Sequence, residues 1–98
     1  MKVIVKVELP DELALFLPEM PATYGRICYW SPTEGHGEAS MDYYIKNTRR
    51  PSIKHEPRVE NLMEQYARNY DCTVERVFKD TRIFRFARWN VERLKLCA

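Results

Sequence analysis

The sequence predicts an α+β fold of two layers, in which one long amphipathic helix packs across a mainly antiparallel sheet of about five strands. Three observations lead to this prediction. Residues 57–70 carry apolar side chains at helical spacing and polar side chains between them. Residues 2–9 alternate between apolar and polar side chains, as a half-buried strand does. Most of the flanking segments also have strand-like patterns.

The helix over residues 57–70 is the clearest of the expected elements. Its apolar stripe consists of Val59, Leu62, Met63, Tyr66 and Tyr70. Pro57 suits the first helical position, because its missing N–H would have no partner there. A helix with one apolar stripe must bury that stripe, so we expect it to cover one face of the sheet.

A short helix is expected near residues 11–17. Pro10, Asp11 and Glu12 have the proline and the acidic first turn of a helix start, and four large apolar residues follow. Pro18 and Pro21 would end this helix after about two turns.

Two strands are expected over residues 24–31 and 40–46, joined by a long hairpin loop over residues 32–39. The loop holds two glycines around His36 and is longer than a tight turn requires. Loops longer than their connecting task often carry contacts.

A second β-hairpin is expected after the long helix, from segments 72–78 and 82–88. Residues 91–96 fit either a strand or a short helix, and their alternation slightly favours the strand.

The composition is that of a globular protein and favours a single domain of 98 residues, 45% of them hydrophobic. No apolar run approaches the roughly 20 residues that span a bilayer. Three widely spaced cysteines, without a C-x-x-C motif, suit reduced thiols better than a disulfide framework. We therefore expect a cytoplasmic protein.

Catalytic and metal-binding motifs are missing from the sequence, and we expect no cofactor. Cys28, His36 and Asp42 supply the residue types of a thiol enzyme or a metal site. Their spacing matches no known pattern, so a thiol or metal enzyme at Cys28 and His36 is a minor alternative.

A protein-binding surface is the favoured interpretation of the aromatic residues. Six tyrosines and two tryptophans are more than a small core can hide, because each buried hydroxyl or indole N–H needs a partner. Tyr, Trp and Arg also dominate protein–protein hot spots. The expected contact residues are Trp30, Glu34, His36 and Tyr44, with Arg49 and Arg50 at the rim.

Nucleic-acid binding is the second hypothesis, because arginines alternate with aromatic residues near the C-terminus. The residues concerned are Arg82, Arg85, Arg88, Trp89 and Arg93. On an open sheet, aromatic rings stack on bases while guanidinium groups contact phosphates.

The sequence thus favours a small, non-catalytic interaction protein, an inhibitor or accessory factor of the size and type common among phage proteins. Nucleic-acid binding is the alternative. A symmetric homodimer through an edge strand is also compatible with the expected sheet.

Overall fold

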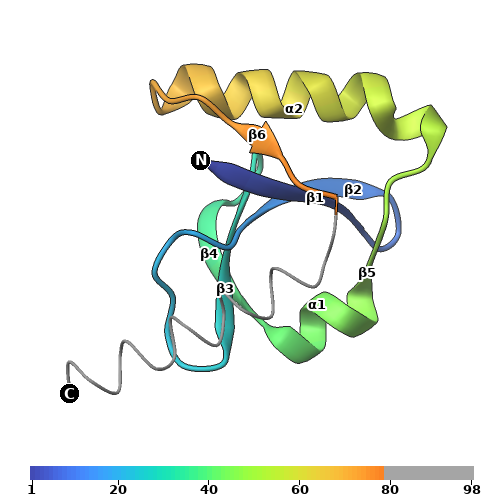
Figure 1. Ribbon diagram of the computed structural model, residues 1–98. Coiled ribbons are helices and arrows are strands. Elements are labelled where there is room, and N and C mark those ends of the chain that lie inside the picture. Colours follow the sequence, from blue (N-terminus) through green and yellow to red (C-terminus); the bar gives the residue numbers. More distant parts are fainter. Residues whose placement is uncertain (79–98) are drawn as a thin grey trace.

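The computed structural model describes residues 1–78 and contains a mixed sheet of six strands with two α-helices (Figure 1). The strands are β1 (Lys2–Glu8), β2 (Glu12–Leu17), β3 (Arg26–Ser31), β4 (Gly35–Ser40), β5 (Thr48–Arg49) and β6 (Glu75–Arg76). The helices are α1 (Met41–Asn47), the 3-10 helix η1 (Ile53–His55) and α2 (Glu56–Asn69). The predicted α+β class is confirmed.

The sheet has the strand order β4-β3-β2-β1-β5, and β6 also pairs with β1. All neighbours are antiparallel except β6, which runs parallel to β1. β6 pairs with Lys2 and Val3, whereas β5 pairs with Val7 and Glu8. Both ends of the β1 edge are therefore covered.

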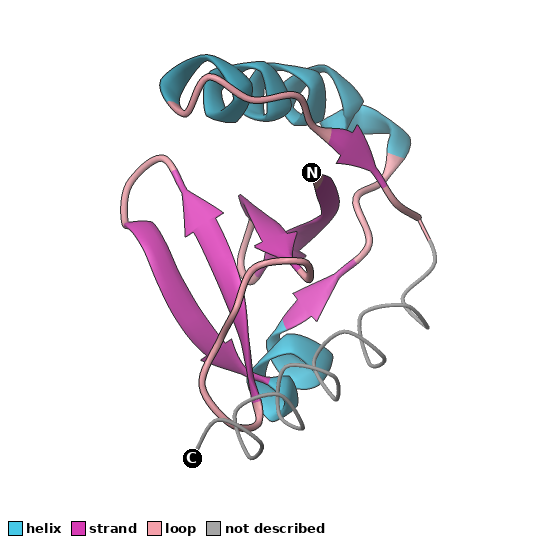
Figure 2. Ribbon diagram, turned by 60° about the vertical axis from the view of Figure 1, so that its left-hand side comes forward, coloured by secondary structure: helices cyan, strands magenta, loops and turns pink. Residues whose placement is uncertain are grey.

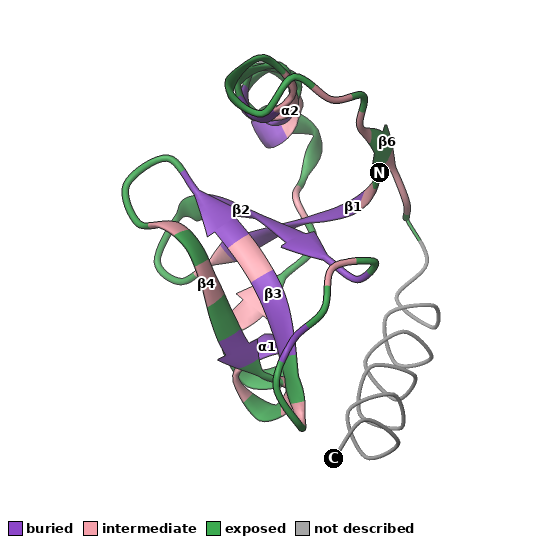
Figure 3. Ribbon diagram, turned by 90° about the vertical axis from the view of Figure 1, so that its left-hand side faces the viewer, coloured by how far each residue is buried: buried purple, intermediate pink, exposed green. Residues whose placement is uncertain are grey.

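The two faces of the sheet bury different side chains. Val3, Val5 and Val7 of β1 face α2, which buries Val59, Leu62 and Tyr66 against them. On the other face a second cluster contains Ile4, Ala14, Phe16, Ile27, Ala39 and Tyr44. Figures 1 and 3 show α2 and α1 on opposite sides of the sheet. The helix predicted over 57–70 is confirmed as α2. Its apolar stripe packs into the larger of the two core clusters.

The short helix predicted near 11–17 is wrong, because this segment forms strand β2. Leu13, Leu15 and Leu17 face α2, while Ala14 and Phe16 face the opposite cluster. Both faces of β2 are buried from Leu13 to Leu17. These five residues are therefore all apolar, and the sequence shows no alternation.

The strand predicted over 40–46 is also wrong, because residues 41–47 form helix α1. The side chain of Ser40 caps this helix by accepting the backbone N–H of Tyr43 at 3.0 Å. Asp42 and Lys46 form an i,i+4 ion pair at 3.3 Å on the exposed side.

The long loop predicted over 32–39 is mostly strand β4, which begins at Gly35. Ser31 and Gly35 are paired across the hairpin, so the connecting turn contains only residues 32–34. Gly35 has a φ of +71°, the left-handed conformation that often closes a three-residue hairpin loop.

The strands predicted over 2–9 and 24–31 are confirmed as β1 and β3. The expectation that residues 2–9 are only half-buried is wrong, because both faces of β1 are covered from Val3 to Val7. Within the segment 72–78, residues 75–76 form β6. The segments 82–88 and 91–96 lie outside the described residues. Among residues 1–78, no helix combines the length and apolar character needed to cross a membrane.

Candidate functional site

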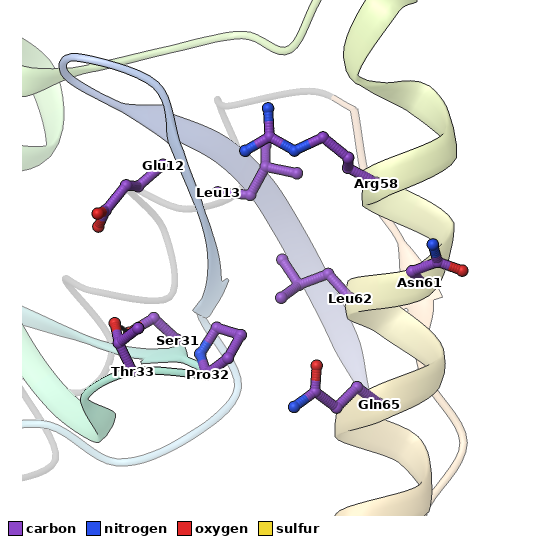
Figure 4. A pocket seen from close by; sticks show the side chains of 9 residues that line it. All are labelled: Glu12, Leu13, Ser31, Pro32, Thr33, Arg58, Asn61, Leu62 and Gln65. Atoms are coloured by element: carbon purple, nitrogen blue, oxygen red, sulfur yellow. Dashed lines mark hydrogen bonds between the residues drawn. The ribbon is translucent and has the colours of Figure 1, made fainter.

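A cleft of about 340 Å³ lies between helix α2, the start of β2 and the turn that joins β3 to β4 (Figure 4). We call it the α2 cleft. Leu13 and Leu62 form its apolar part, and Arg58 and Gln65 reach over it from α2 (Figure 4). The facing wall is formed by Ser31, Pro32 and Thr33, with Glu12 at one side and Asn61 on the helix. The cleft thus combines an apolar floor with polar walls.

Arg58 is held at one end of the cleft by Asp11 in the β1–β2 turn. Its guanidinium group donates to the Asp11 carboxylate at 3.2 Å and to the Asp11 backbone oxygen at 3.0 Å. The buried His55 approaches the same carboxylate, with 2.8 Å between Nε2 and Oδ1. Hydrogen bonds from His55 and then Arg58 lower the pKa of Asp11.

Ser52 completes this group on the other side of the imidazole ring. Its backbone N–H donates to Nδ1 of His55 at 3.0 Å, and its hydroxyl oxygen lies 2.9 Å from the same nitrogen. A serine, a histidine and an aspartate in this order could in principle activate the hydroxyl. Here the backbone N–H shares the accepting nitrogen, and the contacts form the capping box of helix η1. The group therefore fixes the start of α2 and, through Asp11, positions Arg58.

An aromatic cluster lies near the other end of α2 and consists of Trp30, His36, Tyr66 and Tyr70. The Trp30 indole N–H donates to the Tyr70 hydroxyl at 3.0 Å, and Nε2 of His36 lies 3.0 Å from the Tyr66 hydroxyl. The rings of His36 and Tyr70 are in contact, with 4.8 Å between their centroids. Burial raises the pKa of Tyr66 to about 12, so its hydroxyl stays protonated. Tyr70 and His36 are exposed, whereas Trp30 is buried and packs against the Tyr70 ring.

Two residues predicted to face outward, Trp30 and Tyr44, are buried, with exposed fractions of 3% and 2%. Trp30 lies on the face of β3 that α2 covers. Tyr44 belongs to a helix rather than a strand, so it turns toward the sheet and meets the Phe16 ring edge-on at 4.9 Å. The expectation that Trp30 and Tyr44 are exposed is therefore wrong: α2 covers Trp30, and the helical conformation of residues 41–47 turns Tyr44 inward.

The other residues of the predicted contact surface do not gather in one place. His36 joins the aromatic cluster, but Glu34 accepts a hydrogen bond at 2.6 Å from Tyr29, which packs against the opposite core cluster. Arg49 and Arg50 are exposed at and beside β5, at the opposite margin of the sheet from β4. The structure thus separates the predicted surface into distinct regions.

Cys28, His36 and Asp42 do not converge either. Cys28 is buried, and burial followed by the charge of Glu38 raises the pKa of its thiol. Asp42 pairs with Lys46 on α1, and His36 contacts tyrosines. Among residues 1–78, no three His, Cys, Asp or Glu side chains are grouped to hold a metal ion. Cys28 and Cys72 are free thiols.

The sequence pattern did not predict the α2 cleft. Nor did it predict the linked side chains at one end of the cleft, which are Asp11, Ser52, His55 and Arg58. The Ser52-x-x-His55 spacing before a predicted helix was the one local signal for the capping group. The nucleic-acid hypothesis rests on Arg82, Arg85, Arg88, Trp89 and Arg93, all outside the described residues.

Comparison with known proteins adds no further information about the site. No protein-family model, curated protein or solved structure matches this chain.

Proposed function

We propose that this chain is a small, non-catalytic cytoplasmic protein that binds a segment of a protein partner in the α2 cleft, as an inhibitor or accessory factor. The observation that carries the proposal is the apolar floor of Leu13 and Leu62 beneath polar side chains, of which Arg58 is held in place by Asp11. Small binding sites of this type bury an apolar group and orient it with a few polar contacts.

The polar groups of the cleft match the needs of a polypeptide backbone. Gln65 carries an amide donor and an amide acceptor, and its side chain has no hydrogen-bond partner within residues 1–78. The Thr33 hydroxyl on the facing wall can donate or accept. An extended peptide between these walls could pair its own N–H and C=O groups with both sides.

Different chemical groups lie in the cleft and farther along α2, and both could contact the same partner. Arg58 is held in place by Asp11 and retains further N–H donors for an acidic group of the partner. The exposed rings of His36 and Tyr70 belong to the aromatic cluster beside the second half of α2. Amphipathic aromatic residues of this kind are frequent in protein-binding surfaces.

The proposal is tested by capture of partners from the source cell with immobilised protein, with and without nuclease. Gln65→Arg places a long charged side chain across the cleft, so we expect capture to be lost. Asn69→Arg makes the same chemical change on an exposed position of α2 that does not line the cleft, and capture should persist. Thermal melting of both variants checks that each remains folded.

Two outcomes would contradict the proposal. Equal capture by the wild type and the folded Gln65→Arg variant would show that the cleft is not the binding site. Capture that disappears after nuclease treatment would instead support nucleic-acid binding.

A further inference from the structure

Strand β4 forms an open margin of the sheet. It pairs with β3 over six residues, and no other strand of residues 1–78 pairs with it. Figures 2 and 3 both show β4 at the outer side of the β3–β4 hairpin, with no described element along its free side. The opposite margin differs, because β5 and β6 cover the two ends of the β1 edge.

The sequence of β4 contains one charged residue, Glu38, but few of the other devices that prevent an edge strand from pairing with another chain. Residues 35–40 contain no proline and no lysine. Their pairing with β3 runs without interruption from Gly35 to Ser40, so the strand has no bulge. Its backbone is therefore regular enough to accept a further strand.

Two charged or polar side chains make β4 complementary to itself. His36 and Glu38 lie opposite Trp30 and Cys28, so both project from the face that α2 covers. If two β4 strands pair in an antiparallel manner about a two-fold axis at Gly37, each His36 lies opposite the Glu38 of the other copy. Side chains directly opposite each other in such a pair are about 5 Å apart at Cβ, which is close enough for a hydrogen bond between an imidazole and a carboxylate.

Both side chains are held in place by hydrogen bonds within the chain and retain capacity for a further contact. His36 uses Nε2 for the Tyr66 hydroxyl, which leaves Nδ1 without a partner among residues 1–78. Glu38 is fixed by the backbone N–H of Thr23 at 3.0 Å and by its hydroxyl at 2.6 Å. These bonds lower the pKa of Glu38, so it carries a negative charge at neutral pH. An Nδ1–H of His36 can therefore donate to a carboxylate of the second copy.

We infer that two copies of this chain associate through antiparallel pairing of their β4 edges, with reciprocal His36–Glu38 contacts on either side of the two-fold axis. The two sheets then continue as one across the interface. This association goes beyond the proposed partner binding in the α2 cleft and does not depend on it.

Sedimentation velocity of the purified full chain over a range of concentrations tests the inference. We expect a monomer–dimer equilibrium in the wild type. His36→Glu places two carboxylates opposite each other twice in the symmetric interface, and Glu38→Lys removes both carboxylate acceptors, so each should raise the dissociation constant about tenfold. The double variant His36→Glu/Glu38→Lys places opposite charges at the paired positions and should recover dimerisation. Glu60→Lys, an equal charge change on the exposed side of α2, should have no effect.

Hydrogen exchange of the wild type provides a test that does not depend on the folding of a variant. Backbone amides of residues 35–40 should gain protection as the protein concentration rises through the dimerisation range. A monomer at all concentrations would overturn the inference, and so would a double variant that stays as weak as the single variants. Full protection already at the lowest concentration would overturn it too, because another segment of the same chain would then occupy the edge.

Discussion

Trp30 is anchored by its indole N–H, which donates to the Tyr70 hydroxyl, and by edge-on contacts with the rings of Tyr66 and Tyr70. Its removal leaves a large cavity between β3 and α2. We expect Trp30→Ala to lower the free energy of unfolding by about 3–5 kcal/mol, measured by urea denaturation. Ile53→Ala removes a side chain that is 90% exposed and should change it by less than about 0.5 kcal/mol. Equal effects of the two substitutions would mean that Trp30 is not in the core.

Asp11 makes the stability of the protein depend on pH. Hydrogen bonds from His55 and Arg58 lower its folded-state pKa below the ordinary value of 3.8, so the folded state binds this proton less tightly. The resulting stabilisation is fully present above about pH 4 and is lost as the pH falls through the lowered folded-state pKa.

The test compares wild type and Asp11→Asn by chemical denaturation between about pH 6 and pH 2.5. The wild type should lose more unfolding free energy over this range than the variant. Since Glu38 and Glu56 also have lowered pKa values, only the difference between the two proteins reports on Asp11. Parallel pH profiles would show that the Asp11 contacts do not contribute in solution.

Helix α1 depends on the capping residue before it, Ser40, because seven residues are too few for a helix to be stable alone. Ser40→Ala removes the acceptor for the Tyr43 N–H and should cost about 1 kcal/mol of unfolding free energy. Ser40→Asp keeps an acceptor oxygen and adds a negative charge at the helix start, so it should retain the wild-type value. Thermal or urea denaturation of the three proteins measures the difference. A loss of the same size in both variants would contradict the capping role.

At the level of elements, the sequence pattern predicts a segment well when one side of that segment meets water. Helix α2 was predicted for this reason. Strand β1 is buried on both faces from Val3 to Val7, and its pattern alternates only because Lys6 lies on the face opposite α2, where it is buried over the Tyr44 ring. β2 is buried on both faces and therefore shows no alternation. β4 contains two glycines and mostly exposed residues, so it resembles a loop. For α1, the Ser40 cap and the Asp42–Lys46 pair were present but outweighed by a short alternation of apolar residues.

The candidate site was less predictable than the fold because it combines residues from distant segments. Arg58 and Gln65 belong to the polar side of α2, and their role depends on how the helix sits over the β3–β4 turn. His36 was predicted as a contact residue, but its tyrosine partners lie 30 and 34 positions away. Local patterns contain no information about such pairings.

In the molecule as a whole, the chain after α2 returns to the sheet and covers the N-terminal part of β1. Glu75 and Val77 donate their backbone N–H groups to Met1 and Val3, each at 2.8 Å. Arg76, between them, donates to the Glu56 carboxylate at the start of α2 at 2.6 Å. This one ion pair therefore links the edge of the sheet to the helix layer.

Arg76→Ala should loosen this edge without unfolding the remainder of the sheet. The ion pair is partly exposed, so its loss is expected to cost about 1 kcal/mol. Local opening of the β6–β1 pairing should then become about fivefold more frequent. Hydrogen exchange measures this as faster exchange at Glu75 and Val77, with unchanged rates in β2 and β3. Arg68→Ala removes an exposed arginine of α2 that has no ion pair among the described residues, and it should leave all these rates unaltered. Faster exchange throughout the sheet would instead mean that β6 and the central strands unfold as one unit.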